Sequence, residues 1–327
     1  MSSSKCPLTV HDASGQIERA PVDDKVTYKD NIKANPLLKL ITNHSGRHDE
    51  IFFHTYHQIT ELWFRQIITE LDSIQVIFME HKVHQNIMLI IERLDRIIKM
   101  FEVLCDQMKV METLNPLEFV NFRSHLGQSS GFESFQFRMI ENKIGIKKES
   151  RILHNQKHYS EVFKKDPETL EKIEDTETKE SLFDRVNEWL KELYESSNEI
   201  VQDFLNNFSK AFISQPTSKE NSQEFQDTLK EITDTRIYDQ LLAKGERRLS
   251  WESFVTALTI QYQGKFGSFK NEWQLLNLLM DLDQIFMKWR FVHLSLVYRQ
   301  IGVKRGTVGS SGYYYLQSVR LRFLKKS

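Results

Sequence analysis

The sequence predicts an all-α fold, a large helical bundle with an inserted helical subdomain. Turn-forming residues are sparse, with only 12 glycines and 6 prolines among 327 residues. Neither type occurs between Gly46 and Pro116 or between Gly267 and Gly302, and such unbroken stretches are typical of long helices. Apolar residues recur at intervals of three and four, and the sequence contains no alternating strand pattern of useful length and no internal repeat.

The first half of the predicted bundle follows a polar arm. Residues 1–45 are polar and are predicted to form this N-terminal arm. A helix is expected over about 49–80, because apolar residues recur along one face. Asp49 and Glu50 place two acids in its first turn, where the helix dipole favours negative charge. A second amphipathic helix is expected over about 86–111.

Beyond Pro116 the predicted helices become shorter and then more charged. Helix resumes over about 132–144, and the segment 147–248 is rich in charge and is interpreted as a helical insertion. The longest apolar helix is expected over 273–301. The predicted domains are an arm at 1–45, a helical core at 46–146 and 249–327, and an inserted charged helical segment at 147–248.

The composition excludes several classes of protein. Lys and Arg number 44 against 45 Asp and Glu, which gives a net charge of −1 and argues against a nucleic-acid binder, since such proteins carry a basic excess. Two cysteines cannot form a disulfide framework, so we expect a reducing, cytoplasmic compartment. No apolar run is long enough to span a membrane, and we expect no membrane association.

The first candidate site is the segment 48–63, which holds three histidines and three acids. His57 and Glu61 share a helical face, as do Glu50 and His54. The spacing differs from the Glu-x-x-His pairs of di-iron bundles, and no second such helix is present. Histidines satisfied by their neighbours are the simpler interpretation. Phe53 stands one turn before His57, however, and places this histidine beside an aromatic ring.

The second candidate site is Arg123, which lies among aromatic residues just before a small polar turn at 129–131. A guanidinium group matches the two oxygens of a carboxylate ligand in a bidentate pair. Pairing of Arg123 with an acid of the protein itself is the more common situation.

The third candidate site is His293. Leu282, Phe286, Trp289 and Leu296 share its helical face, so the imidazole points toward an apolar environment. A histidine in such a place is usually a hydrogen-bonded core residue. A neutral imidazole on a rigid apolar helix is also what a haem iron ligand requires.

The fourth candidate site is a glycine-rich segment at 302–312, which holds four of the twelve glycines. Together with its hydroxyl groups, such a loop can offer backbone N–H groups to a charged ligand. A surface loop without a ligand is an equally good interpretation. The segment contains neither the P-loop order of residues nor a preceding strand that would support a dinucleotide fingerprint.

Taken together, three segments resemble the tryptophan 2,3-dioxygenase family, and they occur in the order and spacing of that family. They cover about residues 48–145 and 270–320. The matching residues are His48-Asp49-Glu50, His57-Gln58, Glu61-Leu62-Trp63, Phe122-Arg123, Ser130-Gly131-Phe132, Gln136-Phe137-Arg138, Trp289-Arg290, His293, Val297, Arg299, Ile301-Gly302, Lys304, Gly306-Thr307, Gly309-Ser310-Ser311-Gly312-Tyr313 and Tyr315-Leu316.

The resemblance implies an all-helical enzyme with haem b held between helices of the core. By position, His293 matches the ligand of the haem iron. Trp289 matches a residue beside that ligand, and Ser130 matches a small polar residue near the haem edge. The resemblance also implies a homotetramer, in which the tyrosine matched by Tyr28 reaches the site of a neighbouring subunit.

The resemblance further implies that L-tryptophan and O2 are the substrates and that the indole C2–C3 bond is cleaved to give N-formylkynurenine. His57 matches a catalytic histidine near the indole N–H, and Phe53 and Phe119 match aromatic residues of the substrate pocket. Arg123 matches the arginine that binds the substrate carboxylate. Thr307 matches the threonine that contacts the ammonium and carboxylate groups.

The chain departs from the family pattern at Val308, Gln128 and Glu133, where the family usually has glycine, proline and glutamine. An alternative is therefore a haem-dependent oxygenase of the same family that acts on a modified tryptophan or another indole, including as a monooxygenase. A helical binding or scaffold protein without chemistry is a third hypothesis.

Overall fold

The computed structural model describes residues 26–127, 131–146, 162–213, 222–264 and 267–302, and in these ranges it is helical with no strand. The all-α prediction is thereby confirmed. The α-helices are α1 (Tyr28–Asn31), α2 (Ala34–Leu38), α3 (His48–Met79), α4 (Val83–Met111), α5 (Pro116–Arg123), α6 (Phe135–Ile144), α8 (Pro167–Thr178), α9 (Leu182–Ser196), α10 (Asn198–Ile213), α11 (Ser222–Thr233), α12 (Thr235–Ala243), α13 (Trp251–Gln263) and α14 (Lys270–Ile301).

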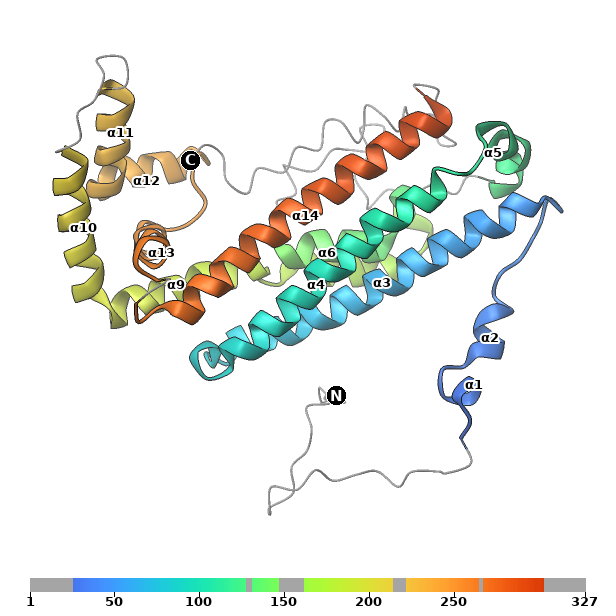
Figure 1. Ribbon diagram of the computed structural model, residues 1–327, viewed down its shortest axis with the longest axis horizontal. Helices are drawn as coiled ribbons and strands as arrows, with labels where there is room; N and C mark the ends of the chain where they lie inside the picture. The colour runs from blue at the N-terminus through green and yellow to red at the C-terminus, as the bar shows by residue number, and fades with distance from the viewer. Residues whose placement is uncertain (1–25, 128–130, 147–161, 214–221, 265–266, 303–327) are drawn as a thin grey trace.

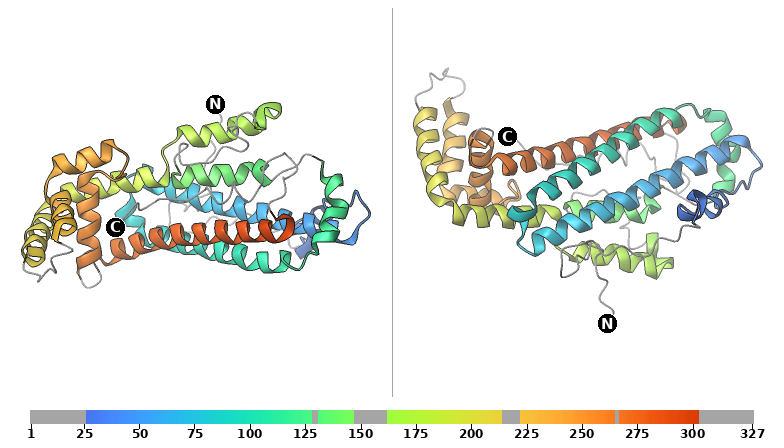
Figure 2. Two further views of the ribbon diagram at one scale, coloured as in Figure 1. Left: turned by 90° about the horizontal axis from the view of Figure 1, so that it is seen from above. Right: turned by 60° about the horizontal axis from the view of Figure 1, so that its bottom comes forward.

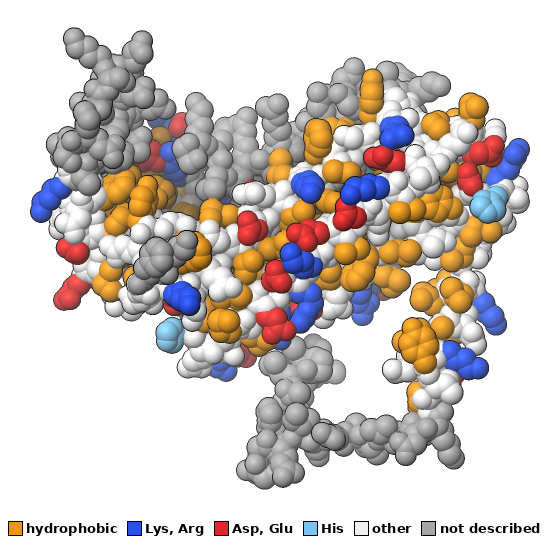
Figure 3. Space-filling model, in the orientation of Figure 1, with side chains coloured by type: hydrophobic (Ala, Val, Ile, Leu, Met, Phe, Trp, Pro, Cys, Tyr) orange, Lys and Arg blue, Asp and Glu red, His pale blue; other side chains and the backbone are white. Residues whose placement is uncertain are grey.

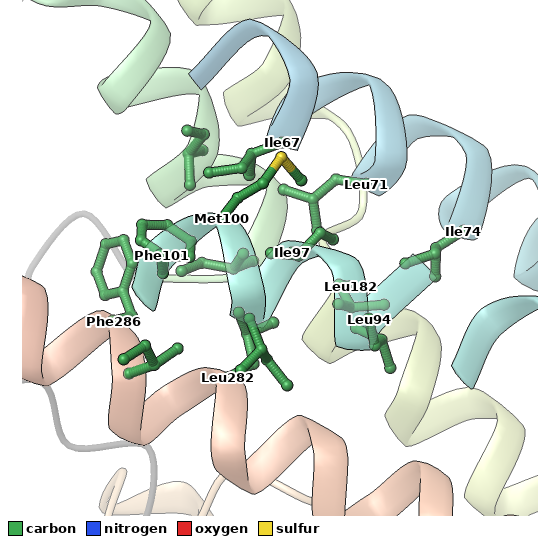
Figure 4. Close-up of a cluster of buried hydrophobic side chains, with 14 of the residues drawn as sticks. Ile67, Leu71, Ile74, Leu94, Ile97, Met100, Phe101, Leu182, Leu282 and Phe286 are labelled. Carbon is green, nitrogen blue, oxygen red and sulfur yellow. The ribbon is translucent and has the colours of Figure 1, made fainter. Parts of the chain in front are cut away.

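Three long helices form the body of the molecule. Helix α4 packs against both α3 and α14, and the three run alongside one another over most of their length (Figure 1). Their shared faces bury a continuous apolar cluster, which is why these sequences fold together rather than as separate helices. Part of the cluster is drawn in Figure 4, with side chains contributed by α3, α4, α9 and α14: Ile67, Leu71, Ile74, Leu94, Ile97, Met100, Phe101, Leu182, Leu282 and Phe286.

Local signals explain where several helices begin and end. Asn115 caps α5 by accepting a hydrogen bond from the Leu117 N–H at 2.9 Å, and Pro116 occupies the first helical position. Helix α6 ends at Gly145, whose φ of 99° is left-handed. A Cβ atom at Gly145 would lie 2.6 Å from Ser181 Oγ, so only glycine fits at this crossing of α6 and α9.

A smaller apolar cluster lies at one end of the bundle, where α10 to α13 gather (Figure 2). Its buried members come from α10, α11 and α13: Val201, Phe204, Leu205, Ile232 and Val255. Helix α9 instead contributes Leu182 and Trp189 to the main cluster. A third, smaller cluster joins Phe163 and Ile173 beside α6, so the described second half of the chain packs around more than one apolar centre. The division into a core and an insertion at 147–248 stays a prediction.

The arm contains two short helices, α1 and α2, which contact each other (Figures 1 and 2). Several apolar side chains of the arm are exposed (Figure 3): Val26, Tyr28, Ile32, Leu37, Leu38 and Leu40. A search of the described helices finds none that combines the length and the apolar character needed to cross a bilayer.

A buried ionic cluster connects α6 to α14. Glu141 is 1% exposed, and its carboxylate accepts a hydrogen bond from Arg138 Nη1 at 2.5 Å. Arg290 Nη1 of α14 lies 3.6 Å from the other carboxylate oxygen of Glu141. Both arginine side chains are 7% exposed. Because removing one partner leaves uncompensated buried charge, this cluster ties the rotation of α14 to the position of α6.

We expect Glu141→Gln to lower the free energy of unfolding by about 3 kcal/mol, because the buried Arg138 and Arg290 guanidinium groups lose the negative charge of this carboxylate. The matched control is Glu92→Gln, which breaks an exposed pair with Arg96 and is expected to cost less than about 1 kcal/mol. Urea unfolding followed by circular dichroism measures both. Equal, small losses in the two variants would contradict the structural importance of Glu141.

A second buried acid, Asp283, lies about two turns before Arg290 on α14. The Oδ1 atom of Asp283 is buried and has no hydrogen-bond partner among the described residues. Burial raises the pKa of Asp283 to about 6, although the nearby Arg248 guanidinium partly opposes this effect. Arg248 itself donates to the Gly145 carbonyl at 2.8 Å and lies 3.8 Å from the Phe183 ring centroid.

A carboxyl whose pKa is higher in the folded than in the unfolded chain binds its proton more tightly when folded. The stability that this proton contributes is present at low pH and is lost as the pH rises through about 6. We therefore expect Asp283→Asn to raise the free energy of unfolding at pH 8 by about 1–2 kcal/mol, with the difference disappearing near pH 4. The exposed Asp281→Asn on the same helix is the control. A pH-independent effect of Asp283→Asn would disprove the assignment.

Candidate active site

Three segments that are distant in sequence meet at one end of the bundle. The N-terminal part of α3, the short helix α5 and the C-terminal part of α14 lie together there (Figure 1). The end of α14 is held by Arg299, which pairs with Glu112 at 2.8 Å, and by Gln300, which donates to the Leu114 carbonyl at 3.0 Å. These contacts place the candidate residues of α3, α5 and α14 in one region.

The His57 side chain is oriented by its own helix. Its Nδ1 atom lies 2.8 Å from the Phe53 carbonyl oxygen, one turn earlier. Since a carbonyl oxygen can only accept, Nδ1 carries the hydrogen and the Nε2 lone pair is left available as an acceptor. Burial lowers the pKa of His57, so the ring stays neutral at pH 7. The residue is nevertheless exposed to solvent in the described part of the chain, so its Nε2 edge can be reached by a ligand.

His293 is a second neutral imidazole that faces the same region. Burial lowers its pKa to about 4, and the charges of His57 and Arg290 add to this effect. The influence of His57 on His293 means that the two rings are close enough for their charges to interact. No hydrogen bond to the His293 ring is found among the described residues, so its nitrogen lone pair is available to a ligand.

Trp289 lies one turn before His293 and stacks on it, with ring centroids 5.4 Å apart and an interplanar angle of 11°. Its indole contacts Phe137 at 4.9 Å and Phe64 at 5.7 Å between ring centroids, which fixes its position. The Trp289 Nε1 donor is buried without a partner in the described part of the chain. An unsatisfied buried donor costs about 1–3 kcal/mol, so this position favours the presence of a bound group that accepts from it.

Aromatic side chains form the wall beside His57. The Phe53 ring lies 4.2 Å from the His57 ring centroid, 5.5 Å from that of Phe119 and 5.6 Å from that of Phe122. Arg123 ends α5, and its Cζ atom lies 5.9 Å from the Phe119 ring centroid. The site therefore combines an apolar aromatic wall with a cation at one edge, an arrangement suited to an aromatic ligand that carries a negative group.

The structure brings together six of the nine site residues predicted from the sequence: Phe53, His57, Phe119, Arg123, Trp289 and His293. Tyr28 is 79% exposed on α1, and no contact between it and these residues is found in the structure. Ser130 and Thr307 lie outside the described residues, as do Gln128 and Val308. Glu133 lies in a short 3-10 turn before α6.

Sequence reasoning missed two contributors to this region. Phe122 is completely buried between Phe53 and Phe119, and its spacing of three residues from Phe119 is the signal that could have indicated it. Glu50 was predicted to lie in the first turn of its helix and on one face with His54, but not to be buried, yet its carboxylate is fully buried. As for the alternative of a non-haem metal, the described residues contain no group of three or more His, Cys, Asp or Glu side chains that could hold an ion.

These features define a class: an all-helical protein whose site lies between two neutral imidazoles, with an aromatic wall and an arginine at the edge. The sequence model of the family described as tryptophan 2,3-dioxygenase matches residues 14–324. The chain therefore belongs to the tryptophan 2,3-dioxygenase family.

Individual relatives agree with this assignment. The tryptophan 2,3-dioxygenase of Anopheles gambiae is 40% identical over 291 residues, which is 83% of this chain and 74% of the relative. That of Aedes aegypti is 36% identical over 96% of this chain and 86% of its own length. The protein of the same name from Rattus norvegicus is 36% identical over 83% of this chain and 71% of its length.

Proposed function

We propose that this chain is a haem-dependent dioxygenase that cleaves the indole C2–C3 bond of L-tryptophan with O2 to give N-formylkynurenine. The observation that carries the proposal is the pair of neutral imidazoles, His57 and His293, at one site in a member of the tryptophan 2,3-dioxygenase family. The curated relatives carry that activity in their names.

The residues beside α14 fit haem b. His293 offers a neutral nitrogen on a rigid helix, and next to it lies the Trp289 donor, which has no partner among the described residues. In this proposal His293 would hold the iron and Trp289 would support the imidazole by stacking, while the family resemblance assigns Ser130 to the haem edge. The haem supplies the binding and activation of O2, while the protein supplies binding and orientation of the substrate.

The substrate is held at both ends. Phe53 and Phe119 offer ring faces to the indole, and Arg123 pairs with the carboxylate in a bidentate manner. Thr307 is assigned to the ammonium and carboxylate groups. Fixing both ends orients the indole ring relative to the reacting oxygen and gives specificity, because an analogue without the carboxylate would leave Arg123 without its ligand.

His57 is proposed to position the indole rather than to remove its proton. Its Nε2 lone pair is the free acceptor left by the Nδ1–H bond to Phe53, and it can receive the indole N–H. An indole N–H is a far weaker acid than an imidazolium ion. Because burial lowers the pKa of His57 further, full proton transfer to this ring is unfavourable.

The arm and the assembly complete the proposal. Tyr28 lies on an arm that exposes several apolar side chains, and apolar surface of this kind is typical of protein interfaces. We assign the arm to subunit contact within a homotetramer, with Tyr28 reaching the substrate site of a neighbour. Sedimentation of the full chain tests this assembly. The cytoplasmic location stays a prediction.

The activity itself is tested by the product. Purified protein reconstituted with haemin, reductant, O2 and L-tryptophan is expected to give N-formylkynurenine, a mass increase of two oxygen atoms. A product with one added oxygen would instead identify a monooxygenase of the same family. Turnover of a substituted indole in the absence of turnover of L-tryptophan would contradict the proposed substrate.

We expect His293→Ala to purify with little haem, because the iron loses its protein ligand. Haem binding stabilises the folded chain by mass action, so added haemin should raise the melting temperature of the wild type but not that of the variant. Absorbance spectra and thermal melts measure the two effects. An unchanged Soret band in His293→Ala would refute the assignment.

We expect His57→Ala to lower turnover only about tenfold, since a single neutral hydrogen bond contributes roughly 0.5–1.5 kcal/mol. With 1-methyl-tryptophan, which has no N–H to donate, wild type and variant should differ little. Initial rates at saturating substrate measure both. A loss of about 10⁴-fold with intact haem and substrate binding would instead show that His57 performs an obligatory proton transfer.

A further inference from the structure

We propose that Glu50 is a positioning residue of the substrate site, because its buried carboxylate anchors the loop 42–47, which in turn holds α5 and its Arg123 against α3. This inference rests on the proposed function for its effect on substrate selectivity. Its structural part concerns only the apposition of two helices and can be tested without substrate.

Glu50 occupies the third helical position of α3, yet its side chain is fully buried. Its carboxylate accepts from the His44 N–H at 2.8 Å and from the Ser45 N–H at 2.7 Å, and it also accepts from the Ser45 hydroxyl. His54, one turn later, approaches the same carboxylate with Nε2 at 3.3 Å. Four donors therefore converge on one carboxylate, and three of them belong to the loop.

These hydrogen bonds keep the carboxylate ionised. Burial alone would raise the pKa of Glu50, but the bonds from Ser45, His44 and His54 outweigh burial and hold the pKa at about 2. A charge-assisted bond to a backbone N–H is stronger than a neutral one. The loop is thus attached to α3 by strong bonds at any pH at which the protein is studied.

The anchored loop has a defined internal structure. Asn43 Oδ1 accepts from the Gly46 N–H at 2.8 Å, and Asn43 Nδ2 donates to the Arg47 carbonyl at 3.1 Å. Gly46 adopts a φ of 73°, which lets the chain turn directly into α3. The bonds of Glu50 and of Asn43 therefore fix where Arg47 leaves the loop.

Arg47 connects the loop to α5. Its Nη1 atom lies 3.9 Å from an oxygen of Glu118, the residue before Phe119. Both side chains are about half exposed, and such a pair contributes little when its members are free to move. Here the pair contributes more to stability, because the anchored loop fixes the backbone position of Arg47.

The same carboxylate also acts on the aromatic wall. His54 lies between Glu50 and Phe53, with its ring at 6.0 Å and 79° to the Phe53 ring. Phe53 contacts Phe119 of α5. Glu50 therefore supports the wall from the α3 side through His54 and from the α5 side through the loop and Arg47.

Loss of this anchor should weaken the binding of ligands that carry a carboxylate more than the binding of ligands that lack one. If α5 shifts away from α3, Arg123 no longer meets the carboxylate of a ligand whose indole stays against Phe53. Displacement of a binding group by about 1 Å can cost up to 10²-fold. Affinity for L-tryptophan then falls toward that of tryptamine, which has no carboxylate, while the environment of His293 on α14 is unchanged.

The test is Glu50→Gln in the haem-loaded full chain, with Asp49→Asn as matched control. Asp49 directly precedes Glu50 in sequence, and its carboxylate contacts the exposed His48. Hydrogen exchange of residues 42–47 and 116–123 is measured first. Relative to the wild type, we expect faster exchange in both segments for Glu50→Gln and unchanged exchange for Asp49→Asn. Unchanged exchange in 116–123 would overturn the proposal, whatever the substrate.

Selectivity is measured second, as the KM for L-tryptophan and the Kd for tryptamine. For Glu50→Gln we expect a KM for L-tryptophan raised roughly tenfold or more, tryptamine binding changed less than about twofold, and an unchanged Soret band. Equal losses for both ligands would overturn the positioning role. If the wild type binds the two ligands equally well, the proposed role of Arg123 is wrong. The hydrogen-exchange result would still stand, because that measurement does not depend on the role of Arg123.

A second variant guards against misfolding of Glu50→Gln. Arg47→Gln combined with Glu118→Gln removes the exposed end of the same connection and leaves the buried carboxylate in place. We expect faster exchange in 116–123 but not in 42–47, together with a smaller loss of selectivity in the same direction. Protected 116–123 in this double variant would show that the loop does not hold α5.

Discussion

The packing of α14 along α4 is the constraint on which the rest of the structure depends. The 32 residues of α14 present Leu282, Phe286 and Trp289 to the core, and the rotation of the helix about its axis is set by their burial. The buried contact of Arg290 with Glu141 favours the same rotation, since another rotation would separate these two charged groups in the interior. His293 lies one turn beyond Trp289, so its direction follows from the same packing.

The site is assembled by short-range geometry on rigid elements. On α3, His57 follows Phe53 by four positions, and one hydrogen bond along the helix selects the tautomer of the imidazole. On α5, Phe119 and Arg123 are likewise one turn apart, so the apolar wall and the cation come from the same short helix.

Because each pair is fixed within its helix, only the positions of three helices relative to one another remain to be set. Burial does this for α3 and α14, whereas α5 has only eight residues and one fully buried side chain. This small contact explains why a loop anchored by Glu50 matters for α5.

Much of the fold could be predicted from residue patterns, because long amphipathic helices carry strong periodic signals. The helices expected over 49–80, 86–111 and 273–301 are found at 48–79, 83–111 and 270–301. The structure adds a non-helical residue, Asn86, near the start of α4, and the short helices α1 and α2 in the arm, whose polar sequence gave no periodicity. The candidate residues of α3, α5 and α14 were also recognised, since aromatic and basic residues beside histidines stand out in a helical pattern.

By itself, the sequence determined the helical class of the protein, its long helices and the residues that match the motifs of the tryptophan 2,3-dioxygenase family. These properties are local, because the periodicity of a helix and the order of residues in a motif can each be read from one continuous segment. The tertiary structure alone decided which charges are buried and what they hold. Glu50, Glu141 and Asp283 look like ordinary surface acids in a helical pattern, and each is withdrawn from solvent only by segments distant in sequence or by a returning loop. The physical reason is that the free energy of a charge depends on the dielectric and the hydrogen-bond donors around it. Neighbours along the helix supply some of these donors, but the burial itself comes from tertiary packing.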